Sequence, residues 1–80
     1  MTTDSKIDDA IFGYLTTANG NWRKVAMVIA QASDAVRGDF PAGQAEYDLV
    51  AKRIVSLVDA GRLLAQGDIT KWRYSEVRVP

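Results

Sequence analysis

The fold of this chain is decided by residues 44–80, which have the sequence QAEYDLVAKRIVSLVDAGRLLAQGDITKWRYSEVRVP. Apolar residues recur there at every third or fourth position, which predicts a helix over residues 44–60. Gly61 follows as a left-handed C-terminal cap, since glycine adopts that conformation at little cost. β-Branched and aromatic residues then predict a hairpin. Its two strands and its turn are expected at residues 62–66, 72–79 and 67–71, respectively.

The register of this hairpin stays open at the level of sequence. One register is modestly favoured because it places opposite charges across from each other. It pairs Gln66 with Trp72, Leu64 with Tyr74 and Arg62 with Glu76. The helix before the hairpin is expected to turn one apolar stripe inward, made of Tyr47, Val50, Ala51, Ile54, Leu57 and Val58.

Two further helices are predicted upstream, over residues 5–15 and 22–36, from the same helical spacing of apolar residues. Residues 16–21 are interpreted as a turn, and Asn21 is well suited to cap the second helix. Residues 37–43 contain two glycines and a proline, which predict a loop. The helices are expected to share one core that includes Trp22, Ile29, Ile54 and Val58.

The order of these elements indicates the fold class. A two-stranded hairpin is marginal in water and needs a helical layer to cover it. Three helices followed by a C-terminal β-hairpin is the order found in winged-helix domains, a variant of the helix-turn-helix. We therefore predict a mostly helical α+β, winged-helix-like fold, with residues 1–80 forming a single domain because a chain of 80 residues supports only one core.

Two separated motifs carry a resemblance. Residues 22–25 are Trp-Arg-Lys-Val, and residues 75–78 are Ser-Glu-Val-Arg, preceded by Ala-Gly-Arg-Leu at 60–63 and Gln-Gly-Asp at 66–68. This pattern is similar to a family of small bacterial proteins of unknown function with winged-helix character, over roughly residues 7–80. The resemblance implies the fold but no activity. The chain departs from a helix-turn-helix in one respect: the expected loop at 37–43 is longer than the ~3–4 residues of that turn. This difference weighs against the standard geometry of DNA docking.

The composition narrows the classes of function. Ten Lys and Arg balance ten Asp and Glu, and the chain has neither His nor Cys. The commonest general base, thiolate chemistry and disulfides are thereby excluded. The carboxylate pairs Asp8–Asp9 and Glu46–Asp48 are interpreted as capping and solvated residues, since neighbours so close in a helix do not face each other. We therefore expect no enzyme, no cofactor and no bound metal.

The location is also an expectation from the sequence. No apolar run approaches the ~18 residues of a membrane span, and residues 1–6 do not resemble a signal peptide. We expect a cytoplasmic protein that does not associate with membranes.

The leading functional hypothesis is a small interaction module that binds a protein partner or a second copy of itself. The second helix has more apolar residues than one core face needs, above all Met27 and Val28. The second strand of the hairpin presents Trp72 and Tyr74, and aromatic side chains are common at interfaces. These four residues are the candidate partner surface. The opposing interpretation is that they are all core residues.

The alternative hypothesis is weak binding of nucleic acid by a winged-helix regulator. Its candidate contacts are basic residues near aromatic ones, namely Arg23, Lys24, Lys71, Arg73 and Arg78. Against it, residues 44–60 would be the recognition helix and carry three acidic residues against two basic ones. The placement of the five cations discriminates between the hypotheses. A shared face would favour nucleic acid, whereas pairing of each with a carboxylate would weigh against it.

Overall fold

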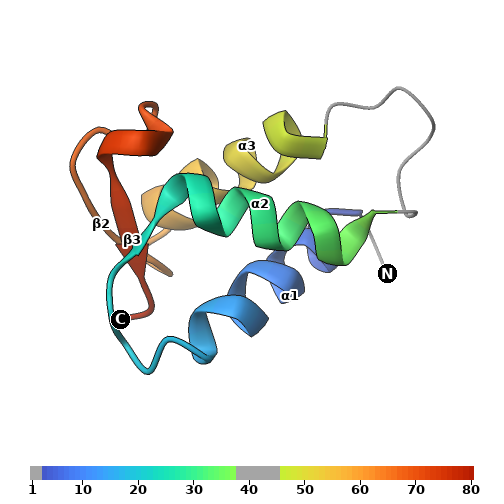
Figure 1. Cartoon of the computed structure of the whole chain (residues 1–80), viewed down its shortest axis with the longest axis horizontal. Helices are drawn as coiled ribbons and strands as arrows, with labels where there is room; N and C mark the ends of the chain where they lie inside the picture. Colours follow the sequence, from blue (N-terminus) through green and yellow to red (C-terminus); the bar gives the residue numbers. More distant parts are fainter. Residues whose placement is uncertain (1–2, 38–45) are drawn as a thin grey trace.

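A computed structural model describes residues 3–37 and 46–80. Three helices pack around one core, and a small sheet closes one end of the molecule (Figure 1). The elements, in chain order, are α1 (Thr3–Thr16), β1 (Arg23–Lys24), α2 (Val25–Val36), α3 (Glu46–Asp59), β2 (Leu64–Gln66), the 3-10 helix η1 (Trp72–Tyr74) and β3 (Glu76–Arg78). Most of the expected loop at 37–43 and the first residues of the expected third helix lie outside the described residues.

The sheet has the strand order β1-β3-β2, so β3 is its central strand. Both neighbours run antiparallel to β3. A short strand between the first two helices thus joins the C-terminal hairpin to make three strands. The predicted α+β, mostly helical, winged-helix-like fold is confirmed, and β1 is an addition to it.

The start of the second helix was predicted too early. The structure begins α2 at Val25, and Lys24 is extended with φ −61° and ψ 138°. Asn21 is therefore not its N-cap. The reason is long-range pairing: Arg23 faces Val77 and Lys24 faces Glu76 across the sheet. The backbone N–H and C=O groups of β1 form hydrogen bonds with β3, so they do not require the hydrogen bonds of a helix.

The hairpin register, left open by the sequence, differs from the one that the sequence modestly favoured. Gln66 pairs with Glu76 rather than with Trp72, and Leu64 pairs with Arg78 rather than with Tyr74. Trp72 and Tyr74 do not belong to a strand, because residues 72–74 form η1. The connection between β2 and β3 therefore spans residues 67–75, and we call this segment the wing.

Local hydrogen bonds explain why the wing is longer than a tight turn. Oδ1 of Asp68 accepts hydrogen bonds from the Thr70 amide (3.0 Å) and the Thr70 hydroxyl (2.6 Å). These bonds, the hydroxyl first, hold the pKa of Asp68 below its ordinary value. The Lys71 carbonyl then accepts from the Tyr74 amide (2.9 Å) and the Ser75 hydroxyl (2.9 Å). Residues 72–75, which were expected to begin the second strand, therefore belong to the second of two successive turns.

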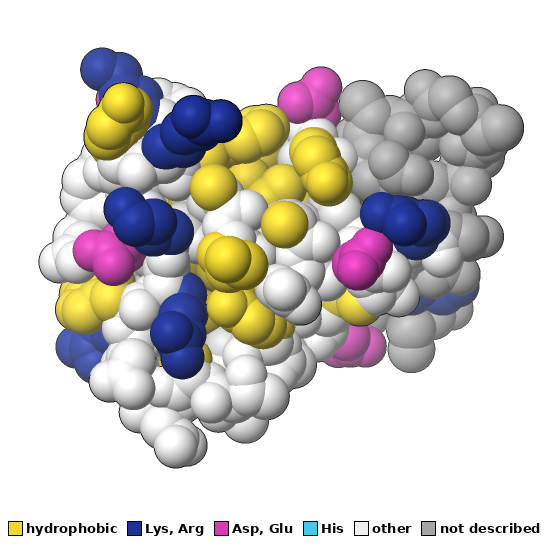
Figure 2. All heavy atoms as spheres, viewed as in Figure 1, with side chains coloured by type: hydrophobic (Ala, Val, Ile, Leu, Met, Phe, Trp, Pro, Cys, Tyr) yellow, Lys and Arg dark blue, Asp and Glu magenta, His cyan; other side chains and the backbone are white. Residues whose placement is uncertain are grey.

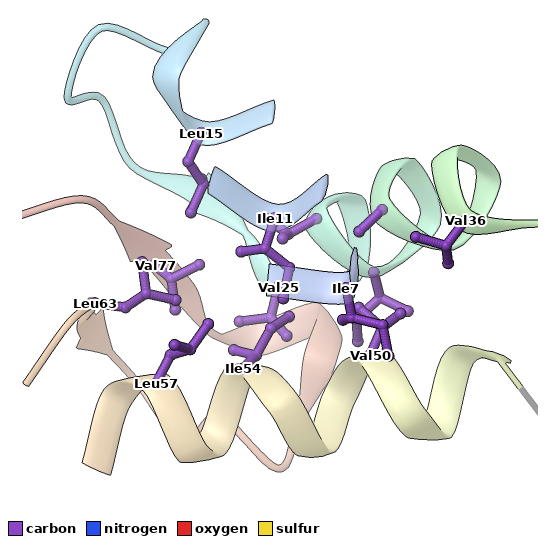
Figure 3. Close-up of a cluster of buried hydrophobic side chains, with 13 residues drawn as sticks. Ile7, Ile11, Leu15, Val25, Val36, Val50, Ile54, Leu57, Leu63 and Val77 are labelled. Atoms are coloured by element: carbon purple, nitrogen blue, oxygen red, sulfur yellow. The ribbon is translucent and has the colours of Figure 1, made fainter. Parts of the chain in front are cut away.

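The core lies between the three helices and the inner face of the sheet (Figure 3). Ile29 and Ile54 belong to it as predicted, and Val58 packs against it while partly exposed. Trp22 does not belong to it. Because β1 is extended, Trp22 lies against Arg78, whose guanidinium is 5.0 Å from the centroid of its ring. The buried cluster comprises Ile7, Ile11, Leu15, Val25, Val28, Ile29, Ala32, Val36, Val50, Ile54, Leu57, Leu63 and Val77.

Two further expectations concern the ends of α3. Tyr47 was predicted to lie on the inward stripe of α3, but it is 51% exposed. It lies in the first turn of α3, and the buried cluster on this helix begins one turn later, at Val50. At the other end Gly61 has φ +76°, which confirms its left-handed conformation.

Charged side chains fix α3 against α1. Arg53 donates to both carboxylate oxygens of Asp8, at 2.9 Å from Nε and 2.8 Å from Nη2. The hydrogen bond with Asp8 raises the pKa of Arg53 above its usual value, although partial burial opposes the shift. Beyond α3, the guanidinium of Arg62 lies 4.9 Å from the centroid of the Phe12 ring. These contacts hold the helix that faces the wing.

Candidate protein interaction surface

An open groove separates the exposed side of α3 from the wing. We call it the wing groove; its volume is about 500 Å³. Its walls are Ala51, Lys52, Val55 and Ser56 of α3 and Ile69, Thr70 and Trp72 of the wing. The four α3 residues lie on one side of the helix because positions four apart are neighbours on its surface. Ala51, Val55, Ile69 and Trp72 make the walls largely apolar.

Trp72 connects this groove to a second hollow. Its side chain is half-buried and packs against the core, so the ring is held in place by the fold. Thr70 and Trp72 also line the second hollow, together with Lys71, Arg73 and Tyr74. We call it the wing hollow; its volume is about 300 Å³. Tyr74 is 78% exposed, the most exposed large hydrophobic residue of the described chain.

A third hollow, of about 310 Å³, lies beside β1; we call it the β1 hollow. It is lined by Tyr14, Trp22, Arg23, Lys24, Met27 and Glu76. The Nζ of Lys24 donates to the Arg73 carbonyl at 3.4 Å, which links the rim of this hollow to the wing. The carboxylate of Glu76 accepts a 2.6 Å hydrogen bond from Gln66.

The structure separates the four residues of the candidate partner surface. Trp72 and Tyr74 meet in the wing hollow, while Met27, 48% exposed, lies in the β1 hollow. Val28 is not a surface residue, because it is 0% exposed. The reason is that α2 packs against both α1 and α3, so more than one of its faces is covered. The surplus of apolar residues on α2 is thus partly explained by burial.

The five candidate cations lie on the elements of one end of the molecule, namely β1, the wing and β3. Figure 2 shows Lys and Arg side chains gathered on the left, the side that carries the sheet in Figure 1, beside an apolar patch. Arg23, Lys24, Lys71 and Arg73 are exposed. Arg78 differs, because it is half-buried against Trp22 and donates to the Gly20 carbonyl at 3.4 Å. Among the side chains that the structure describes, none of the five forms a salt bridge with a carboxylate.

The outward side of α3 carries negative charge near both ends of the helix, in contrast to the cations of β1, the wing and β3. Asp48 and Asp59 are exposed, about one turn before and after the groove residues. Arg53 forms a salt bridge with Asp8, so Lys52 is the cation that α3 contributes to the groove. A helix with this charge pattern is poorly suited to phosphates.

Sequence reasoning identified Trp72 and Tyr74 of the wing but missed one groove residue on each wall, Val55 of α3 and Ile69 of the wing. Val55 lies outside the predicted inward stripe of α3, and Ile69 is an isolated apolar residue in the predicted turn. Both departures from the pattern were visible signals, but they became meaningful only when the structure placed the two residues across one groove.

The part of the chain that the structure describes offers neither a metal site nor a membrane span. There, no group of three His, Cys, Asp or Glu residues is placed to hold a metal ion. No described helix has the length and apolar character needed to cross a membrane. Comparisons of the chain with family models, curated proteins and solved structures give no match. The family resemblance drawn from the sequence therefore stays a prediction.

Proposed function

We propose that this chain is a non-enzymatic interaction module that binds a segment of a protein partner in the wing groove. The observation that carries the proposal is the groove itself, an apolar depression open to solvent between α3 and a wing fixed by local hydrogen bonds. Its volume of about 500 Å³ falls in the range of ligand-binding sites.

The side chains of the groove support binding rather than chemistry. Ser56 and Thr70 offer hydroxyl groups and Lys52 offers an ammonium group. None of the lining residues is a carboxylate or an imidazole that would activate a hydroxyl as a nucleophile. The groove therefore supplies apolar contact area and hydrogen bonds, the features of a docking site.

A second candidate function, weak binding of nucleic acid, is favoured by one specific observation. Arg23, Lys24, Lys71 and Arg73 are exposed on one end of the molecule and form no salt bridge with a described carboxylate. Nearby, Tyr74 offers a ring on which a base can stack. The acidic residues of α3 weigh against docking of a duplex on this helix, so we rank this function second.

A selection experiment tests the proposal. The full chain is immobilised and used to select binders from a displayed library of random 12-residue peptides. Selected peptides are then titrated, by fluorescence anisotropy, against the wild type, Ser56→Glu and Gln31→Glu. Both positions are exposed and gain the same charge, but Gln31 lies outside the three hollows.

The proposal predicts that Ser56→Glu weakens binding at least tenfold while Gln31→Glu leaves it unchanged, with circular dichroism showing that both variants fold. A selection that yields no binder, or binders that tolerate Ser56→Glu, contradicts the proposal. The bacterial origin and cytoplasmic location expected from the sequence stay predictions.

A further inference from the structure

We infer that the segment bound in the wing groove is acidic as well as apolar: its apolar side chains enter the groove, and its carboxylates lie over Lys71 and Arg73 of the wing. This inference rests on the proposed function and specifies the chemistry of the partner. It joins two observations that the fold places side by side, an apolar groove and an exposed group of cations.

The wing groove and the wing hollow adjoin each other. Thr70 and Trp72 line both the wing groove and the wing hollow. A segment that runs along the groove and passes Trp72 therefore meets Lys71 and Arg73. Trp72 packs against the core and contributes apolar surface to both hollows.

The two wing cations are available to a partner. Lys71 and Arg73 are exposed and form no salt bridge with a described carboxylate, although the charge of Lys71 acts on Asp68. Two carboxylates of the wing and of β3 are engaged in hydrogen bonds: Asp68 accepts from Thr70, and Glu76 accepts from Gln66. A carboxylate of the partner would displace only solvent from the cations.

Charges on α3 and on the wing orient a bound acidic segment. Asp48 and Asp59 lie on α3 beyond the two ends of the groove and would repel a carboxylate there. Lys24 donates to the Arg73 carbonyl and so adds positive charge on the side of the wing. Lys52 is a groove cation on the α3 side, but the wing side carries three cations. The acidic residues of the partner therefore lie mainly over the wing, with its apolar residues toward α3.

The same features disfavour nucleic acid as the occupant. Ala51, Val55 and Ile69 make much of the groove wall and offer no hydrogen-bonding side chain to a base edge or a phosphate. Lys52 is the only cation among the described residues that line the groove. A polyanion long enough to span the groove would also pass Asp48 or Asp59. A short segment with apolar and acidic residues avoids both problems.

The test uses the peptides selected with the displayed library described above. Their composition is compared with that of the unselected library, and their affinity is measured for Lys71→Glu, Arg73→Glu and the control Arg37→Glu. Arg37 is an exposed cation that follows α2, at the end away from the sheet (Figure 1). The control carries the same change of net charge, so it separates a local contact from a general electrostatic attraction.

We expect enrichment of Asp and Glu alongside apolar residues, and an affinity that falls at least tenfold in Lys71→Glu and in Arg73→Glu but less than twofold in Arg37→Glu. Peptides that depend on Ser56 but are not acidic, and that tolerate Lys71→Glu, overturn this inference and leave the proposed function standing. A selection without any groove-dependent peptide overturns both.

Two other occupants are tested in parallel. A 12-nucleotide single-stranded DNA and a duplex are titrated as competitors of the selected peptide, and displacement below micromolar concentration at 150 mM salt overturns the inference in favour of nucleic acid. Light scattering reports self-association, and a dimer that dissociates in Ser56→Glu overturns it in favour of a second copy of the chain.

Discussion

Substitution of Gly67 tests the shape of the wing directly. Gly67 has φ +79°, and a Cβ at this position would lie 2.5 Å from the Tyr74 carbonyl oxygen and 3.2 Å from the Ser75 Cα. Left-handed backbone costs a non-glycine residue about 1–2 kcal/mol. The steric conflict adds to this cost, because both opposing atoms belong to the backbone and must move with the wing. In Gly67→Ala, the free energy of unfolding is therefore expected to fall by more than this conformational cost alone.

Gly61 is the matched control for this prediction. Its φ is +76°, nearly the same, but a Cβ there would meet nothing within 4 Å. Gly61→Ala should cost only the conformational cost of about 1–2 kcal/mol, and each kcal/mol lowers the melting temperature by about 4–8 °C in a domain of this size. Urea denaturation of both variants, followed by circular dichroism, measures the difference. An equal loss of stability in Gly67→Ala and Gly61→Ala would refute the close approach of the wing backbone.

Four further predictions follow from the packing and the charges. Ile54→Ala should lower the free energy of unfolding by about 2–5 kcal/mol, measured by urea denaturation, because it leaves a cavity in the shared core; an unchanged midpoint contradicts the packing of α3. Asp8→Asn should cost about 1.5–3 kcal/mol by the same measurement, since it weakens the charged hydrogen bonds of Arg53; a loss that persists in an Arg53→Met background contradicts this cause. The carboxyl of Asp68 should titrate by NMR below the ordinary value of about 3.9, and Thr70→Val should raise its pKa; because the folded pKa is lowered, the contribution of Asp68 to stability is present above the unfolded pKa and is lost as the pH falls through the folded one. Duplex DNA should bind weakly and dissociate between about 50 and 200 mM salt, as expected for few phosphate contacts; sequence-selective binding below micromolar concentration at physiological salt would reverse the ranking of the two functions.

The parts of the fold that could be predicted from the sequence have local causes. Helical spacing of apolar residues located the helices, and the positive φ of Gly61 followed from its position after the third helix. The strand β1 had no local signal of this kind. Its two residues are Arg23 and Lys24, and their extended backbone is explained by pairing with β3 more than fifty residues later. A periodic pattern cannot report a partner so distant in sequence.

The wing shows a different limit. Its aromatic and β-branched residues are typical of a strand, but Asp68 and Thr70 form hydrogen bonds two residues apart that favour a turn. That pair was a readable signal, and it competes with strand propensity at residues 72–74. For the candidate site, Trp72 and Tyr74 were recognised from their chemistry. Val28 was predicted on the surface but is buried. The sequence of one helix does not show how many other helices pack against it.

The central claim is that the wing groove is the binding site of this chain. Titration of the isotope-labelled full chain with a selected peptide, followed through the backbone amide resonances, tests it most directly. The account predicts that the largest shifts fall on residues 51–56 and 69–73, with Met27 and its neighbours in the β1 hollow unchanged. Shifts centred on Met27 and Trp22, or spread evenly over the chain, would contradict it.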